Sequence, residues 1–318
     1  MSTFAGFTNA DFDAYAQKKW KSNVFTRERL EVKQKLLQLG RELMPAMLAA
    51  DGSPLACEAS VEYPALWNHK QVEAQHLYFS RNEGARKELD LIIDRQKSLA
   101  SMIDDPSPQR NHVFLAVSLG NTELEVSVKL HPDARVDRQN LERKCEDHFE
   151  AEKLVRVVRE LGGSWRAGVT PELSAAAELD EEKLKQILGK LAQPAPMALP
   201  GAPQRLLYVG HALPKEQVVE RGAGVVGELR EALGRLGAIY RFIAWSRDND
   251  FVSMKETLQK ERQAKRQKGV SRNDPVRIVR GILAGKSGVV QEIDAKGQLK
   301  VLVGKMAVKV DAADVDKA

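Results

Sequence analysis

The segment 275–315 alternates valine, isoleucine and leucine with charged residues, and glycines separate the alternating runs. A spacing of two places one side of each run in a core and the other in water, which is typical of β-strands. Strands are predicted at Val276 and Ile278 and over 289–293, 299–303 and 306–310. Because glycine-containing turns join these short strands, residues 274–318 are expected to form a small β-barrel.

The stretch 280–290, Arg-Gly-Ile-Leu-Ala-Gly-Lys-Ser-Gly-Val-Val, resembles the KOW motif of NusG-type transcription factors and several ribosomal proteins. Gly281, Gly285 and Gly288 match the glycines that shape the turn of that motif. The hairpin through Lys296, Gly297 and residues 301–303 continues the resemblance, which covers about one seventh of the chain. It implies a barrel that binds RNA, ribosomal components or transcription proteins. Leu283 stands where the family has an aromatic residue, and residues 274–318 contain no Phe, Tyr or Trp. Base stacking is therefore not available to this segment, whereas contact with phosphates or with a protein is.

Positive charge is concentrated before and within this segment. The chain of 318 residues has a net charge of +5, yet residues 252–273 carry seven basic and only two acidic side chains. Glu-to-Lys pairs at i, i+4 predict a basic helical connector over 251–273. Such a concentration of charge predicts contact with a polyanion. The residues predicted to contact RNA or DNA phosphates are Lys255, Lys260, Arg262, Lys265, Arg266, Lys268, Arg272, Arg277, Arg280, Lys286 and Lys305.

Residues 1–250 mix helical and strand patterns, so the whole chain is predicted to be α+β, with an N-terminal α/β domain and the C-terminal barrel. The strongest strand signal is a hairpin of 112–118 and 123–129, with Leu124, Val126 and Val128 on its buried side. The remaining predicted elements are helices over 9–18, 26–49, 84–102, 137–161, 181–191 and 215–236, and strands over 57–61, 164–168, 205–210 and 238–245. Thr170 and Pro171 are interpreted as the start of a further helix. The proline-rich stretch 192–203 is interpreted as an internal linker.

Residues 1–165 also resemble a family of uncharacterised bacterial α/β proteins. The resemblance lies in the order of two helices and a later hairpin, and in the Phe-x-x-x-Asp-Phe segment at 7–12. It implies no activity.

Three motifs have the residue types of catalytic or cofactor sites, but a simpler structural interpretation is preferred for each. On a helix, His69, Glu73 and His76 would share one face, but their spacing is not that of a zinc-protease motif, and surface histidines are the preferred interpretation. Cys145 has no catalytic histidine signature and is interpreted as a half-buried helix residue. The G-x-G-x-x-G spacing at 222–227 does not follow a strand directly, as a dinucleotide site requires. No catalytic residue, metal site or cofactor is therefore predicted.

Two cysteines and the lack of a membrane-length apolar stretch favour a cytoplasmic protein that is not a membrane protein. No secretory signal is expected. The preferred hypothesis is a nucleic-acid-associated protein of transcription or translation, attached through its connector and barrel. One alternative is an enzyme whose site lies in the N-terminal domain, with the barrel as a targeting module. Another is an adaptor that binds a transcription or ribosomal protein.

Overall fold

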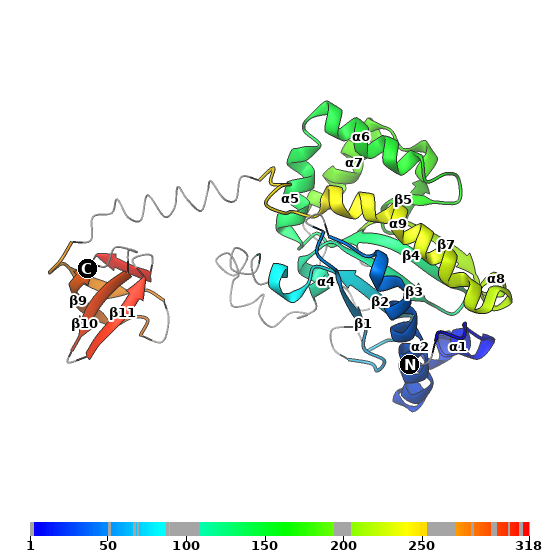
Figure 1. Cartoon of the computed structure of the whole chain (residues 1–318), viewed down its shortest axis with the longest axis horizontal. Helices are drawn as coiled ribbons and strands as arrows, with labels where there is room; N and C mark the ends of the chain where they lie inside the picture. Colours follow the sequence, from blue (N-terminus) through cyan, green and yellow to red (C-terminus); the bar gives the residue numbers. More distant parts are fainter. Residues whose placement is uncertain are drawn as a thin grey trace. The chain divides into compact units, whose positions relative to one another are not determined.

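The computed structural model of the chain contains two compact units, Met1–Val252 (unit 1) and Ser253–Ala318 (unit 2). Both contain antiparallel sheets, and unit 1 adds helices, so the fold is α+β (Figure 1). The structure describes residues 3–49, 52–65, 68, 70–86, 89, 108–193, 205–252, 271–280, 283–293, 298–304, 306–311 and 314–317.

Unit 1 is built on a seven-stranded sheet with the strand order β1-β2-β3-β4-β7-β5-β6, in which all pairs are antiparallel. Its strands are β1 (Ala56–Ala59), β2 (Gln75–Ser80), β3 (Phe114–Leu119), β4 (Glu123–Leu130), β5 (Arg166–Val169), β6 (Glu172–Ala175) and β7 (Leu207–Pro214). The predicted hairpin is present as β3 and β4, with Leu119 opposite Leu124. Leu124, Val126 and Val128 are buried, as their alternation predicts.

The helices of unit 1 provide the apolar surface that covers this sheet. They are α1 (Asn9–Asp13), α2 (Thr26–Leu43), α4 (Pro108–Asn111), α5 (Arg135–Lys144), α6 (His148–Arg159), α7 (Glu181–Ala192), α8 (Lys215–Arg221) and α9 (Val225–Ile243). Helix α2 contacts β1 and β2, and α9 contacts β3 and β4. Helix α9 crosses the sheet in Figure 1, and helices α5 and α6 pack against α9. Val32, Leu36 and Leu39 lie on the buried side of α2 because their spacing follows the helical repeat.

Several predicted helices differ in extent from those observed. Helix α1 ends at Asp13 and α2 at Leu43, so both are shorter than predicted. The single helix predicted over 137–161 is two helices, because Asp147 caps α6 by accepting hydrogen bonds from the backbone N–H groups of Phe149 and Glu150.

The predicted βαβ arrangement after residue 205 is wrong. Helix α9 continues to Ile243, so the predicted strand 238–245 does not exist. Its β-branched and aromatic residues belong to a helical face, since Leu236, Tyr240 and Ile243 are all buried at helical spacing. Strand β7 instead pairs with β4 and β5.

Thr170 and Pro171 do not start a helix. They form the tight turn between β5 and β6, where Val169 pairs directly with Glu172. The helix on which Glu73 and His76 would share one face, which was not the preferred interpretation, is not present, because His76 belongs to β2 and Glu73 precedes that strand. His69, most of the helix predicted over 84–102 and most of the linker 192–203 lie outside the described residues.

Unit 2 contains a five-stranded antiparallel sheet in the order β11-β10-β9-β8-β12. Its strands are β8 (Pro275–Ile278), β9 (Ser287–Ile293), β10 (Gln298–Val303), β11 (Met306–Asp311) and β12 (Val315–Lys317). The first four lie where alternation predicts them, and β12 was not predicted. The residues at the centre of its core are Val276, Ile278, Val290, Leu299, Val301 and Val315.

Candidate nucleic-acid interface and charged clusters

Four of the predicted phosphate-contacting residues belong to the described part of unit 2: Arg272, Arg277, Arg280 and Lys286. The others lie outside the described residues, as does Gly281: Lys255, Lys260, Arg262, Lys265, Arg266, Lys268 and Lys305.

Three of these four cations gather around the turn between β8 and β9. Arg277 lies on β8 opposite Ser287. The N–H of Ile278 donates to the Lys286 carbonyl at 2.8 Å, and the N–H of Gly285 donates to the Ile278 carbonyl at 2.7 Å. These bonds bring Lys286 beside the end of β8, where Arg280 follows. Arg272 precedes β8 and belongs to the opposite end of that strand.

Two glycines give this turn its shape. Gly285 has a φ of +87°, a conformation that side chains disfavour. A Cβ on Gly288 would lie 2.5 Å from the carbonyl oxygen of Leu302 on β10, closer than any side chain can approach. Strand β9 therefore approaches β10 closely at this point, which requires glycine.

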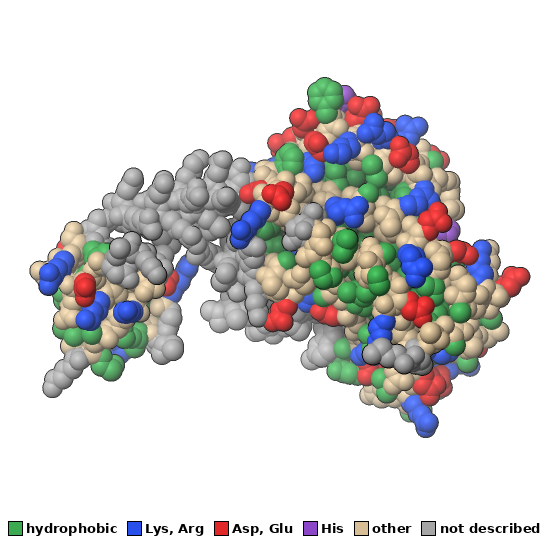
Figure 2. All heavy atoms as spheres, viewed as in Figure 1, with side chains coloured by type: hydrophobic (Ala, Val, Ile, Leu, Met, Phe, Trp, Pro, Cys, Tyr) green, Lys and Arg blue, Asp and Glu red, His purple; other side chains and the backbone are tan. Residues whose placement is uncertain are grey.

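The described basic residues of unit 2 are exposed, and most of them have no ion pair with another described residue. Among the described residues, Lys317 pairs with Asp274 at 2.8 Å, and Lys300 lies 4.0 Å from Glu292. No ion pair within the described part of the chain involves the exposed Arg272, Arg277, Arg280, Lys286 or Lys309. Figure 2 shows several Lys and Arg side chains on the visible surface of this unit. These five cations can accept an anionic ligand without first breaking an internal ion pair.

In unit 1, by contrast, Arg81 and Asp137 form a buried ion pair with two contacts of 2.5 and 2.7 Å. The Asp137 carboxylate also accepts from the N–H groups of Val113 and Trp245, each at 2.8 Å. Burial opposes ionisation of Asp137, but the charge and hydrogen bonds of Arg81 keep its pKa below the usual value. His112 lies 3.4 Å from Arg81, so this histidine belongs to the same network. The network links residues beside β2, β3 and the end of α9 to Asp137 on α5. Its role is therefore structural.

A second polar cluster lies on the side of the central sheet opposite the apolar residues of β4. Glu125 accepts from the Ser127 hydroxyl at 2.8 Å and pairs with Lys129 at 2.7 Å. Tyr208, on the neighbouring β7, also hydrogen-bonds Glu125, and burial with this carboxylate raises the pKa of the Tyr208 phenol. Burial disfavours the charge on Glu125, but Lys129 and Ser127 still keep its pKa below the usual value. The Glu125 carboxylate therefore already has contacts with Ser127, Lys129 and Tyr208.

His76 extends this cluster onto β2. Its Nδ1 lies 2.8 Å from the Ser118 hydroxyl, and its ring stacks on Tyr78. Burial, followed by the positive charge of Lys129, lowers the pKa of His76 to about 4, so the ring is neutral at pH 7. A serine beside a neutral histidine can transfer its proton to that ring, but catalytic pairs of this kind also use a third group that orients the base. Here the nearby carboxylate, Glu125, is engaged by Lys129 and Tyr208 instead.

Sequence reasoning did not find either cluster, because the partners are far apart in the chain. Arg81 and Asp137 are 56 positions apart, and His76 and Ser118 are 42. One signal was present: Glu125, Ser127 and Lys129 occupy alternate positions on the polar side of the predicted hairpin. That alternation places them on one face, but it does not specify which strands lie beside them.

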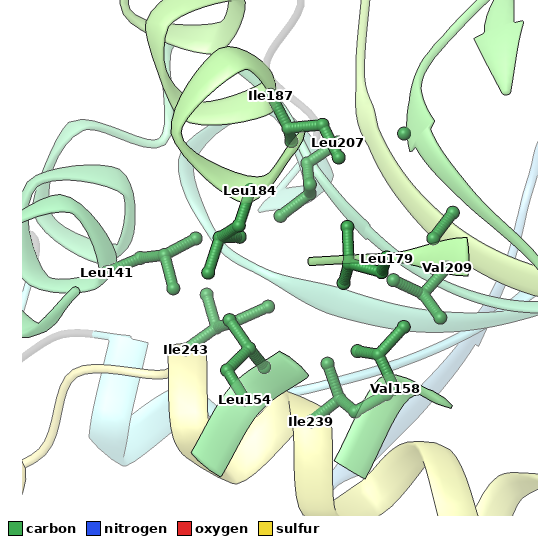
Figure 3. Close-up of a pocket in the computed structure, with 12 residues that line it drawn as sticks. Leu141, Leu154, Val158, Leu179, Leu184, Ile187, Leu207, Val209, Ile239 and Ile243 are labelled. Carbon is green, nitrogen blue, oxygen red and sulfur yellow. The ribbon is translucent and has the colours of Figure 1, made fainter. Parts of the chain in front are cut away.

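The cysteines and the apolar cavity of unit 1 show no features of a reactive site. Burial raises the pKa of both Cys57 and Cys145 to about 12, so neither is a thiolate at neutral pH. Cys145 is buried and ends α5. The cavity lies between the helices and β7, where Leu154, Leu184 and Ile239 point toward one another (Figure 3). Its volume is about 20 Å³ and its side chains are all apolar, so it has room for one water-sized group and nothing to bind it.

The part of the chain that the structure describes contains no group of three or more His, Cys, Asp or Glu side chains arranged for a metal. None of its helices combines the length and apolar character needed to cross a membrane. No known family model matches this sequence, and no curated protein is detectably similar to it.

Proposed function

We propose that the chain binds nucleic acid through the phosphate backbone, using unit 2 and the basic residues that precede its sheet. The observation that carries the proposal is the set of exposed cations without ion pairs in the described part of unit 2: Arg272, Arg277, Arg280, Lys286 and Lys309. Cations of this kind attract a polyanion, and binding releases the counterions condensed on it.

Two sequence features support the same proposal. Residues 252–273 add a further excess of Lys and Arg next to unit 2. The stretch 280–290 resembles the KOW motif, whose barrels bind RNA, ribosomal components or transcription proteins. The five-stranded sheet is compatible with such a barrel. We therefore propose a cytoplasmic role in transcription or translation, in which unit 1 is the attached effector.

The proposal is tested by measuring the affinity of the full chain for a fluorescent 20-base-pair RNA. In one variant, the five exposed cations of unit 2 are changed to glutamine. Each phosphate contact contributes about 0.9 to the slope of log affinity against log salt, so losing five contacts should weaken binding about 30,000-fold at 0.1 M salt.

A matched control changes five exposed cations of unit 1 that have no ion pair among the described residues. They are Lys18, Lys21, Arg143, Arg159 and Lys185. This control should leave the affinity within about threefold of the unchanged chain, because under the proposal these cations contact no phosphate and salt screens their remaining effect. Equal loss of affinity in the two variants would contradict a site on unit 2.

An enzyme site in unit 1 would require a pocket that joins a histidine to free carboxylates. His76 and His112 lie in separate hydrogen-bonded networks, and the nearby carboxylates are engaged by Lys129 and Arg81. These contacts support a structural role for both histidines.

A further inference from the structure

The solvent-facing side of the unit 2 sheet carries an ordered pattern that the sequence alone does not reveal. Directly paired residues lie side by side on the same face of a sheet. The pairs Pro275 with Val289, Val289 with Leu302, and Leu302 with Ala307 therefore form one row across four strands. This row faces away from the core, and Val289 is 43% exposed. We name these four residues the apolar row.

Cations flank the apolar row on both sides. Arg277 lies two residues from Pro275 along β8 and on the same face. Lys300 and Lys309 each lie two residues beyond the row, in the opposite direction along the sheet, on β10 and β11. Each side also carries one carboxylate, because Asp316 is paired with Arg277 and Glu292 with Lys300. Along the strands, four residue steps of about 3.3 Å separate Arg277 from the pair Lys300 and Lys309 by about 13 Å.

The pairing of Lys300 with Lys309 is informative because the two residues are directly opposite one another. Like charges in this position destabilise a sheet, so they do not serve the fold. Lys300 has only a distant contact with Glu292, and Lys309 has no ion pair among the described residues. An anionic group placed between the two ammonium groups would remove their repulsion.

We propose that this face docks on double-helical RNA, with Arg277 on the phosphates of one strand, Lys300 and Lys309 on those of the other, and the apolar row over the sugars between them. The inference rests on the proposed function and names its ligand. Residues 252–318 contain no aromatic side chain, so single-stranded bases would find no ring to stack on. In a duplex the bases are already stacked on one another. The minor groove of double-helical RNA is wide and shallow, so side chains standing on the face of a sheet can reach its sugars and phosphates, whereas the deeper grooves of DNA are read by protruding elements.

The experiment uses the full chain and three fluorescent ligands of one sequence: duplex RNA, single-stranded RNA and duplex DNA. Affinities are measured at 0.1 M salt for the unchanged chain, for the variant Arg277→Gln/Lys300→Gln/Lys309→Gln, and for the control Lys18→Gln/Lys21→Gln/Lys185→Gln. Duplex RNA should bind most tightly. The unit 2 variant should lose about 500-fold in duplex affinity at 0.1 M salt, since three contacts at about 0.9 each account for a slope of about 2.7. The control variant should lose little affinity for duplex RNA.

The outcomes separate this inference from the proposed function. Equal or tighter binding of single-stranded RNA would overturn the duplex assignment while leaving phosphate binding in place, and equal binding of duplex DNA would overturn the choice of RNA. If the unit 2 variant binds duplex RNA as tightly as the unchanged chain and melts at the same temperature, this face of the unit 2 sheet is not the binding site. If none of the three ligands binds at low salt, the proposed function itself fails, and a protein becomes the partner to seek for the apolar row.

Discussion

Both units have exposed cations without ion pairs among the described residues, but of the two only unit 1 also has described cations buried in its fold. In unit 1, Arg81 and Lys129 lie in the fold with carboxylate partners, and their side chains are only 5% and 15% exposed. In unit 2, Arg277 and Lys309 are exposed without ion pairs among the described residues. A charge removed from water must be paired, whereas an exposed charge adds little to stability. The comparison indicates that unit 1 holds part of its positive charge inside the fold, whereas the described cations of unit 2 all lie at the surface, where a ligand can reach them.

The largest expected effect comes from breaking the buried pair of unit 1. Asp137→Asn should lower the free energy of unfolding by about 3–5 kcal/mol, because it leaves the Arg81 charge buried without a counterion. The measurement is urea unfolding of the full chain, monitored by tryptophan fluorescence. Arg27→Gln is the control, since Arg27 pairs with Glu31 at the surface, and it should cost less than about 0.5 kcal/mol. A similar small loss for both variants would show that the buried pair is not what distinguishes unit 1.

A smaller effect should appear in the pH dependence of unit 1 through His76. Its folded pKa of about 4 is below the unfolded value of 6.5. The unfolded chain therefore binds a proton first as the pH falls, and the stability associated with His76 is present above pH 6.5 and is lost between pH 6.5 and 4. Between pH 7 and pH 5 the loss should be at most about 2 kcal/mol.

This pH dependence is checked by unfolding the unchanged chain and His76→Gln at both pH values. The variant should show the smaller loss of stability on acidification, because glutamine does not titrate while it can still hydrogen-bond Ser118. Identical losses in both proteins would mean that His76 is protonated equally easily in the folded and unfolded chain.

The smallest expected effect concerns the unpaired cations of unit 2. Lys309→Gln removes one of two like charges that lie directly opposite each other, so it should leave stability unchanged or raise it by a few tenths of a kcal/mol. The difference in stability between the variant and the unchanged chain is measured by thermal unfolding at low salt. A decrease of more than about 1 kcal/mol in the free energy of unfolding would show that Lys309 stabilises the fold. That result would contradict the expectation that the exposed cations of unit 2 do not serve its stability.

The sequence predicted the elements whose signals are local. Alternation in 123–129 and in 275–310 identified strands β4 and β8–β11, and helical spacing identified α2 and α7. It failed where tertiary contacts decide the structure. The residues 238–243 have strand-like composition, but they continue α9 because its apolar side already packs on β3 and β4. Pro171 was assigned to a helix start because nothing local shows that β5 and β6 pair on either side of it.

The candidate interface was predictable in its charge and unpredictable in its geometry. The excess of Lys and Arg around unit 2 can be counted in the sequence. The apolar row depends on the register of β9 with β10, which a bulge shifts between Lys300 and Val301, and the opposition of Lys300 and Lys309 depends on the register of β10 with β11. One extra residue at that point changes which side chains are neighbours, and alternation alone does not locate it.

The central claim, that the cations of unit 2 serve a ligand, is tested most directly by the salt dependence of RNA binding by the full chain. If the five exposed cations each neutralise one phosphate, log affinity should fall against log salt with a slope of about −4.5 or steeper, or about 500-fold between 50 and 200 mM salt. A slope near zero, or no binding at 50 mM salt, would contradict the claim.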